Sequence, residues 1–436
     1  MKGYNVETRF SFGWDQARDA NVIWSMLIEG KPTLIGPQVV SDNAFFLGPL
    51  WYYLLTPFYI ISGLDPLGAI YSVIFTGLIT ILAMYFFIKK IAGAPAAMIA
   101  SVIWAGNSDI LAWNPMLVPV LSIGLLYGII KIIEGSKTSI VWSLLLFGLS
   151  LQIHFQMTFF FIPLLISWVI YIKKNKQLPL KEFALGISLF TLTFAPLIIF
   201  DLRHEFLNSK GVLKIFGPGM DNPEWNIDYF TQLKTIVQKN LNSNFFLPES
   251  PVPRNIVGIF VLSISLYGLL KLKTSNTLKF IFFSVLFLPF LLFSFYKGRL
   301  SEYYFALCLI PIILGFAYSL TLLLNKNFLL KILVISFLFY ITYLNIKFAL
   351  LVGNDYGLIH QKNVVKYLKN QTDDNLINVS YDVPYNYDVG FKYLIKYYRL
   401  NTKDAPEAHL WTISIPSNKE PNAYRAVFGS TGIIRR

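Results

Sequence analysis

Long apolar runs separated by short polar segments dominate the chain. Ten of these runs approach the roughly 20 residues that a helix needs to cross a bilayer, and they predict ten transmembrane helices. Their approximate bounds are 66–88, 95–112, 115–133, 139–155, 157–172, 183–200, 255–272, 278–296, 303–324 and 328–350. The pattern is typical of an all-α polytopic membrane protein.

Three further segments have other patterns. Residues 16–30 repeat apolar side chains at helical spacing but are too polar to span, which predicts a helix lying at the membrane surface. Residues 45–63 are apolar and aromatic but are interrupted by Pro49 and Pro57, and we expect a second interfacial helix there. Residues 351–436 alternate helix-like and strand-like patterns and predict a small α/β tail.

The lysines orient the predicted helices. They gather in the short loops after every second apolar run, whereas the other short loops hold only Lys297 and Arg299. The loop lysines are Lys89, Lys90, Lys131, Lys137, Lys173, Lys174, Lys176, Lys181, Lys271, Lys273, Lys279, Lys326 and Lys331. By the positive-inside rule these loops face the cytoplasm, so we expect a multi-pass protein of the cytoplasmic membrane with both termini outside.

This orientation divides the chain into three predicted parts. Residues 1–64 form an extracytoplasmic loop with interfacial helices, residues 65–350 the transmembrane domain, and residues 351–436 the extracytoplasmic tail. Nothing in residues 1–14 would carry the first loop across a membrane. We therefore expect that a first span is missing upstream of this sequence.

Composition narrows the class further. The chain is 55% hydrophobic and only 14% charged, with a mean hydropathy of +0.54, whereas soluble domains carry about 25% charged residues. The net charge of +13 lies in membrane loops, which argues against a nucleic-acid partner. A single cysteine, Cys308, excludes an intramolecular disulfide and a cysteine-based metal cluster.

Three charged residues, Asp15, Arg18 and Asp19, lie close together in the segment FSFGWDQARDA (10–20) near the start of the chain. On a helix the two carboxylates share one face, where their repulsion needs a cation or a substrate to offset it. Arg18 can supply that cation. Helix capping by Asp15 is an equally good account of that residue taken alone.

Other polar residues are predicted at the ends of the apolar runs on the same, extracytoplasmic face. Ionisable groups near a bilayer are costly and usually mark a site or a path. Simpler accounts exist for His154 as a satisfied interfacial histidine, for Asn114 as a helix cap, and for Lys297 and Arg299 as partners of lipid headgroups. The segment DLRHEF (201–206) is denser in charge than a helix end requires. The candidates are Asn114, His154, Arg203, His204, Lys297, Arg299 and Tyr303.

Acids with Arg, His and Lys at one membrane face suit group transfer from a lipid phosphate. A carboxylate can deprotonate an acceptor hydroxyl while cations stabilise the departing phosphate. Glycosyl transfer with inversion needs one such base, and a phosphate leaving group needs no second carboxylate to protonate it.

Four segments resemble the GT-C superfamily of membrane glycosyltransferases, in particular the family 39/83-like branch related to protein O-mannosyltransferases and the lipid A aminoarabinose transferase. DQAR (15–18) is similar to the family's acidic D-E-x-R motif, and GPLWYY (48–53) to its proline-rich helix. WNPMLVP (113–119) and EYYFALCLIP (302–311) are similar to segments at the starts of later spans. The family begins with a further span, which would bring the total to eleven.

The resemblance implies an inverting hexosyl- or pentosyltransferase. Its donor would be a polyprenyl-phosphate-linked sugar and its acceptor a glycan, lipid or protein of the cell envelope, with no cofactor and with metal dependence left open. Asp15 would be the catalytic base. Residues carried over or chosen by position to bind substrate are Arg18, Asp19, Asn114, His154, Arg203, His204, Lys297, Arg299 and Tyr303.

The sequence departs from the family at three places. Gln16 replaces the second acid of the motif, Leu47 and Gly48 stand where relatives often have a charged residue, and Asn114 stands where some have an aspartate. Three other functions stay open: a flippase or transporter of lipid-linked glycans, an O-antigen-type polymerase or ligase, and a membrane scaffold without activity. A transporter would be expected to carry ionisable groups at mid-membrane, whereas here they gather at one face.

Overall fold

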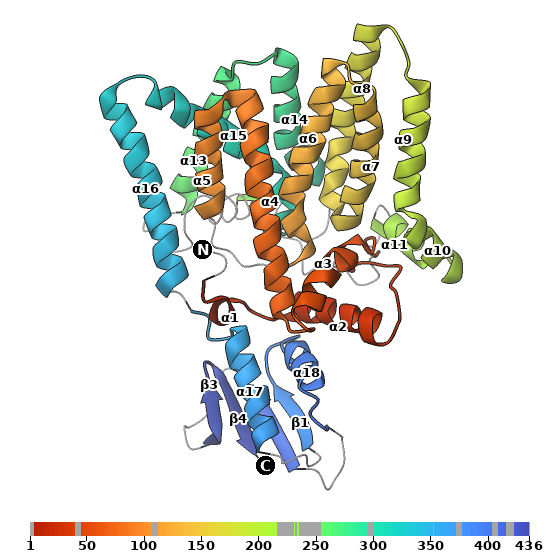
Figure 1. Ribbon diagram of the computed structural model, residues 1–436, viewed down its shortest axis with the longest axis vertical. Helices are drawn as coiled ribbons and strands as arrows, with labels where there is room; N and C mark the ends of the chain where they lie inside the picture. Colours follow the sequence, from red (N-terminus) through yellow and green to blue (C-terminus); the bar gives the residue numbers. More distant parts are fainter. Residues whose placement is uncertain are drawn as a thin grey trace.

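The computed structural model describes residues 4–39, 45–106, 112–215, 231, 233–234, 254–294, 300–351, 353–371, 377–402, 409–415 and 423–435. Helices occupy all ten predicted apolar runs and stand side by side as a bundle (Figure 1). They are α4 (Leu67–Ala92), α5 (Ala94–Gly106), η1 (Asn114–Leu117) with α6 (Val118–Glu134), α7 (Thr138–Ile153), η2 (Phe155–Phe160) with α8 (Phe161–Asn175), α9 (Leu180–Thr193) with α10 (Ala195–Arg203), α13 (Arg254–Lys271), α14 (Asn276–Phe293), η4 (Glu302–Cys308) with α15 (Leu309–Leu324), and α16 (Phe328–Leu351).

Not all of these helices are equally long. Six are long and apolar enough to cross a membrane, and α9 with α10 makes a seventh if the bent pair is one span. The predicted single helix 183–200 is broken, because α9 and α10 meet at an angle of 49°. Pro196 has no N–H to donate, and its ring would clash with the carbonyl four residues before it in a continuous helix. Helix α9 therefore ends before Pro196, and α10 begins with this proline in its first turn. The remaining predicted spans, α5, α7 and α13, are shorter apolar helices.

Helix α15 lies at the centre of the bundle. Of its apolar window 83% is buried, against 17% for the peripheral helix α16. Gly268 of α13 and Gly315 of α15 let the two backbones approach so closely that a Cβ on either would collide with the other helix. Small residues at such crossings are how helices pack in membranes, where water does not drive association.

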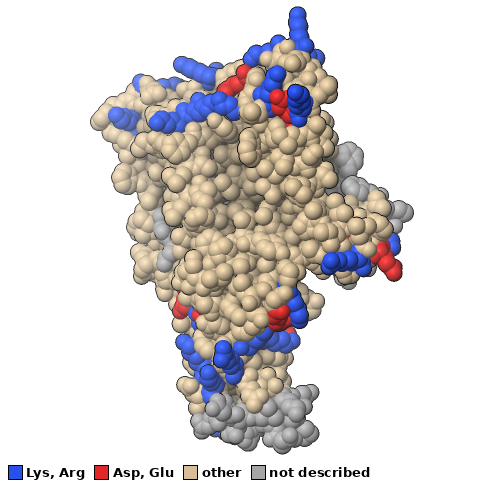
Figure 2. Space-filling view, turned by 45° about the vertical axis from the view of Figure 1, so that its right-hand side comes forward, with Lys and Arg blue, Asp and Glu red and all other residues tan. Residues whose placement is uncertain are grey.

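The two ends of the bundle differ in charge. Lysines form a band at the end opposite the C-terminal sheet (Figure 2). There Lys90 lies 3.1 Å from Glu134, and Lys137 donates to Gln177 at 2.9 Å, so the loops that follow α4, α6 and α8 meet. The interfacial helices lie at the other end (Figure 1).

That other end is built from α1 (Val6–Arg9), α2 (Trp14–Ile28), α3 (Leu50–Ile61) and α11 (Leu207–Ile215). Helix α2 begins two residues before the predicted helix 16–30, and it buries Ala17, Ala20 and Ile23 on its apolar side. Ile28, the last residue of α2, is 60% exposed and does not pack against the rest of the chain.

The C-terminal part has the predicted α/β character. Helices α17 (Leu358–Asn370) and α18 (Asp388–Tyr397) pack with a four-stranded sheet of order β1-β2-β4-β3. Strands β1 (Ile377–Asp382) and β2 (His409–Ser414) are parallel, and β4 (Thr431–Arg435) is antiparallel to β2 and to β3 (Ala426–Phe428). Its core is continuous with that of α2 and α3, so the C-terminal part is fixed to the interfacial helices.

Candidate active site

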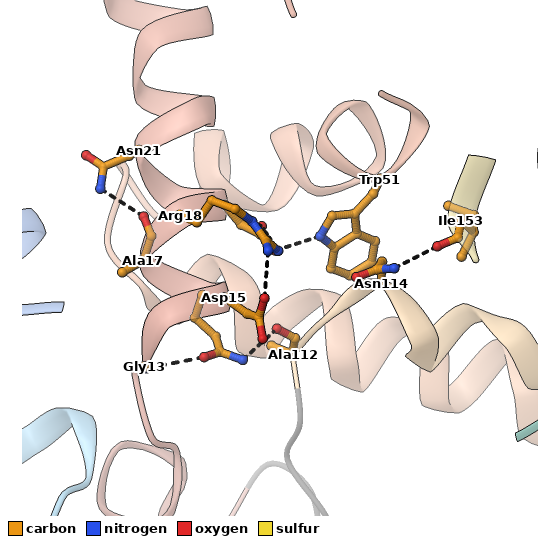
Figure 3. A network of polar contacts seen from close by, with 11 residues as sticks. Gly13, Asp15, Ala17, Arg18, Asn21, Trp51, Ala112, Asn114 and Ile153 are labelled. Carbon is orange, nitrogen blue, oxygen red and sulfur yellow. Dashed lines mark hydrogen bonds and ion pairs between the residues drawn. The ribbon is translucent and has the colours of Figure 1, made fainter. Parts of the chain in front are cut away.

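The first turns of α2 bring Asp15, Arg18 and Asp19 together, and Figure 3 shows Asp15 beside Arg18. Arg18 Nη1 lies 2.6 Å from Asp15 Oδ1, and Arg18 Nη2 lies 2.7 Å from Asp19 Oδ1. One guanidinium therefore bridges both carboxylates and offsets the repulsion expected at that spacing.

The two carboxylates differ in exposure. The Asp15 side chain is 38% exposed, whereas that of Asp19 is 2% exposed. Asp19 Oδ2 accepts a hydrogen bond of 2.6 Å from Trp51 Nε1 of α3. Burial raises the pKa of Asp19 to about 6, while Arg18 and the Trp51 hydrogen bond act in the opposite direction. Asp19 is thus ionised at neutral pH and binds Arg18, and Asp15 is the more accessible carboxylate of the two.

Gln16, the departure from the acidic motif, has a structural role. Its Oε1 accepts from Gly13 N at 3.2 Å and its Nε2 donates to Ala112 O at 3.1 Å. The first bond satisfies an amide at the helix start, and the second ties α2 to the segment that leads into η1. A carboxylate could not donate to Ala112 O. An amide is therefore the residue type that fits here.

Gly48, the second departure, is explained by space. A Cβ at this position would collide with the side chain of Gln152, which itself donates to Thr193 O at 2.6 Å. A side chain at position 48 would therefore displace the Gln152 side chain and its hydrogen bond to Thr193 O.

A second polar group lies at the ends of α6, α7 and α15. Asn114 is buried and donates to Ile153 O at 2.7 Å. The ring centroids of Trp113 and Tyr303 are 4.5 Å apart, and those of His154 and Tyr303 are 5.5 Å apart. The candidates Asn114, His154 and Tyr303 are therefore brought together, and Gln16 links them to α2 through Ala112.

The protonation of His154 follows from its partners. Gln156 donates its backbone N–H to His154 Nδ1 at 3.2 Å, so Nδ1 accepts and a neutral ring carries its proton on Nε2. The buried Gln156 side chain also donates to Tyr303 O at 2.9 Å and accepts from Leu307 N at 3.3 Å. Gln156, which sequence reasoning missed, holds η2 against η4.

The titratable residues of the segment DLRHEF (201–206) do not form one cluster, because Asp201 and His204 have separate partners. Asp201 is buried and accepts from Asn208 N at 2.7 Å and from Ser209 Oγ at 2.6 Å, so it caps α11. His204 stacks on Phe200 with ring centroids 4.2 Å apart. Arg203 is exposed at the end of α10.

The residues on either side of this segment contact the chain that leads into α3. Asn208 Oδ1 accepts from Phe46 N at 2.6 Å, and the rings of Phe46 and Phe200 have centroids 6.0 Å apart. His204 lies near the segment that runs into α3 because it stacks on Phe200, which contacts Phe46. Arg203 and His204 make no hydrogen bond or ion pair to Asp15 in the described part of the chain.

Two of the predicted substrate-binding residues, Lys297 and Arg299, lie outside the described residues. Trp51 and Tyr52 contact the charged cluster, and sequence reasoning selected neither as a site residue. Their place in the segment GPLWYY was the available signal. Among the described residues, no group of three or more His, Cys, Asp or Glu side chains could hold a metal ion.

No protein-family model matches the sequence, and no curated protein matches it. Solved structures do match. The chain superposes on ArnT from Cupriavidus metallidurans bound to undecaprenyl phosphate, and on the apo form of that protein, with a TM-score of 0.62 and 12% identity. In the bound form the match covers 99% of this chain and 95% of ArnT.

A second match is the archaeal oligosaccharyltransferase AglB from Archaeoglobus fulgidus, in complex with an inhibitory peptide and a dolichol-phosphate. The TM-score is 0.50 at 11% identity, over 93% of this chain and 66% of AglB. The chain therefore shares its overall fold with ArnT and AglB, which agrees with the fold that the sequence motifs predicted.

Proposed function

We propose that this protein is an inverting glycosyltransferase that moves a sugar from a polyprenyl-phosphate-linked donor to a cell-envelope glycan, lipid or protein. The reaction would take place on the outer face of the cytoplasmic membrane. The observation that carries the proposal is the unequal pair on α2: a buried Asp19 anchors Arg18, and Arg18 holds an accessible Asp15.

In the proposed reaction Asp15 accepts the proton of an acceptor hydroxyl. The hydroxyl oxygen attacks the anomeric carbon, the bond from that carbon to the phosphate oxygen breaks, and the phosphate leaves with the electron pair. Attack from the face opposite the phosphate inverts the anomeric centre. Asp15 uses one oxygen, Oδ1, for Arg18 at 2.6 Å. Oδ2 accepts no hydrogen bond from the described part of the chain, which leaves an acceptor for that proton.

The donor phosphate would be held where α2 meets the ends of the membrane-spanning helices. Asn114, His154 and Tyr303 line that junction. Arg203, Lys297 and Arg299 remain candidates to neutralise the phosphate. The match to a structure bound to undecaprenyl phosphate supports a lipid-phosphate leaving group.

The proposed sidedness rests on the lysine band. Helix α2 and the lysine-rich loops lie at opposite ends of the bundle (Figures 1 and 2). Because lysine-rich loops stay cytoplasmic, this supports a site that faces away from the cytoplasm.

The testing experiment separates an enzyme from a flippase. Purified protein in detergent micelles is given a polyprenyl-phosphate sugar donor and cell-envelope acceptors, and the released polyprenyl phosphate is measured. An enzyme needs no sealed bilayer, so transfer in micelles supports the proposal. Movement of the donor across proteoliposomes with no transfer in micelles would favour transport instead.

A further inference from the structure

A buried lysine connects the C-terminal part to the segment that carries the acidic motif. Lys362 of α17 is 4% exposed. Its Nζ lies 2.8 Å from Glu7 Oε1 in α1 and 2.8 Å from Asp65 Oδ2 in the turn between α3 and α4. A buried ammonium is tolerated only when it is well paired, and removal of one partner of such a group is strongly destabilising. Lys362 thus ties three separate segments to one point.

The backbone of residues 8–12, which leads from α1 into α2, is held by the C-terminal part of the chain. Asn354 N donates to Thr8 O at 3.0 Å, Leu358 N donates to Phe10 O at 2.7 Å, and Gln361 Nε2 donates to Phe12 O at 3.3 Å. These bonds fix the short stretch that leads directly to the start of α2 at Trp14.

Two glycines permit this close approach. A Cβ at Gly357 would collide with Thr8 O, and a Cβ at Gly390 would lie 2.5 Å from Phe12 O. The side chains of Phe10 and Phe12 are buried, with exposures of 1% and 0%. The residues just before α2 are therefore buried against the C-terminal part of the chain.

Helix α18 holds the other side of α2. Tyr393 packs edge-on against Trp24, with ring centroids 6.2 Å apart, and its hydroxyl donates to Leu64 O at 2.6 Å. Lys396 lies 4.7 Å from the centre of the Trp24 ring and 3.6 Å from Glu29. The C-terminal part thus contacts α2 near its end as well as the segment before its start.

The charged cluster itself receives nothing from this domain. In the described chain, the hydrogen bonds and ion pairs of Asp15, Arg18 and Asp19 go to one another and to Trp51 and Tyr52 of α3. We propose that the C-terminal domain, pinned by Lys362, sets the position of the Asp15 carboxylate, which makes Lys362 a positioning residue for sugar transfer. This inference rests on the proposed function, and it assigns the domain a role in the transfer step and not in acceptor binding.

The test uses the full chain and four variants. Lys362→Met removes the charge and keeps the stem, and Lys362→Arg keeps a cation that can bind two carboxylates. The combined variant Glu7→Gln, Lys362→Met, Asp65→Asn leaves no unpaired charge, and its Asn keeps the acceptor for Leu67 N that Asp65 Oδ1 supplies at 2.9 Å. Lys392→Met is the matched control, because this α18 lysine is 58% exposed and pairs with Asp388 of its own helix.

We expect kcat to fall about 10- to 100-fold in Lys362→Met and in the combined variant, because small displacements of a reacting group have effects of that size. The KM for donor and acceptor should stay unchanged, Lys362→Arg should recover most of the rate, and Lys392→Met should behave as wild type. An unchanged kcat overturns the inference. A raised acceptor KM with normal kcat also overturns it, in favour of acceptor binding by the domain. If Lys362→Met fails to fold, the combined variant decides.

A second readout does not depend on activity. Amide hydrogen exchange in the first turn of α2, over residues 13–18, should be faster in Lys362→Met and unchanged in Lys392→Met. If the wild-type protein transfers no sugar, the proposed function has failed, and exchange alone judges the positioning. Equal exchange in wild type and Lys362→Met would then overturn it.

Discussion

Trp51 donates its indole N–H to Asp19 Oδ2 over 2.6 Å, inside the interface between α3 and α2. The other oxygen of this buried carboxylate binds Arg18, which in turn holds Asp15. Trp51 therefore supports Asp15 indirectly, through Asp19 and Arg18. The segments DQAR and GPLWYY, two of the four that resemble glycosyltransferase motifs, thus lie in contact in the fold.

Loss of this hydrogen bond should be measurable. Trp51→Phe leaves Asp19 Oδ2 buried without its donor, which we expect to lower the free energy of unfolding by about 1–3 kcal/mol and to reduce sugar transfer. Thermal unfolding in detergent and initial transfer rates measure the two effects. Trp142→Phe is the matched control, because Trp142 is 66% exposed on the outside of the bundle. Equal losses in both variants would show that the indole N–H has no special role.

The raised pKa of Asp19 predicts a pH dependence. Its value of about 6 means that the folded protein binds this proton more tightly than the unfolded chain. The contribution of Asp19 to the free energy of unfolding is therefore greatest below pH 4 and is lost as pH rises to about 6. Over the same pH range Asp19 ionises and forms its ion pair with Arg18. We expect sugar transfer to fall as pH drops through about 6.

The pH profile has two checks of its own. Asp19→Asn cannot ionise, so its weak transfer should lack the acid limb near pH 6. Trp51→Phe removes a hydrogen bond that lowers the pKa of Asp19, so its acid limb should move to higher pH. An acid limb of wild-type shape in Asp19→Asn would assign the titration to another group.

Restoring the acid that the family motif carries should not help this protein. Gln16→Glu loses the donor to Ala112 O and adds a negative charge beside Asp15, so we expect lower stability, by about 1–2 kcal/mol, and slower transfer. Gln16→Ala removes the same hydrogen bonds without adding charge. The glutamate variant should be the worse of the two in both assays, and transfer faster than wild type would refute this reading of Gln16.

Sidedness can be tested by cysteine labelling, because the native Cys308 is 1% exposed. Lys392→Cys on α18 and Lys173→Cys at the end of α8 place thiols at opposite ends of the bundle. In right-side-out membrane vesicles an impermeant maleimide should label the first variant only, and both after the vesicles are broken. Labelling of Lys173→Cys alone in intact vesicles would invert the proposed orientation.

Much of the fold could be predicted because bilayer-length apolar runs and lysine placement are local signals. The bend at Phe194 escaped prediction, although Pro196 is visible in the sequence, because composition alone reads 183–200 as one run. The pairing of residues 8–12 with residues 354–361 could not be foreseen, since Phe12 and Gln361 are 349 residues apart in the sequence. Local patterns carry no information on such contacts.

The candidate site was predictable only in part. The spacing of Asp15, Arg18 and Asp19 indicated one shared face, and the ion pairs agree with it. The division into an accessible and a buried acid depends on Trp51, which is distant in sequence. Asp201 drew attention as a charge, but in the fold it caps α11.

The most direct test of the whole account is single-turnover sugar transfer by Asp15→Asn. The amide keeps an oxygen for Arg18 and cannot accept the proton of the acceptor hydroxyl. We predict a rate at least about 100-fold below wild type, with unchanged thermal unfolding and unchanged donor binding. A rate close to that of the wild type would contradict the assignment of Asp15 as the base.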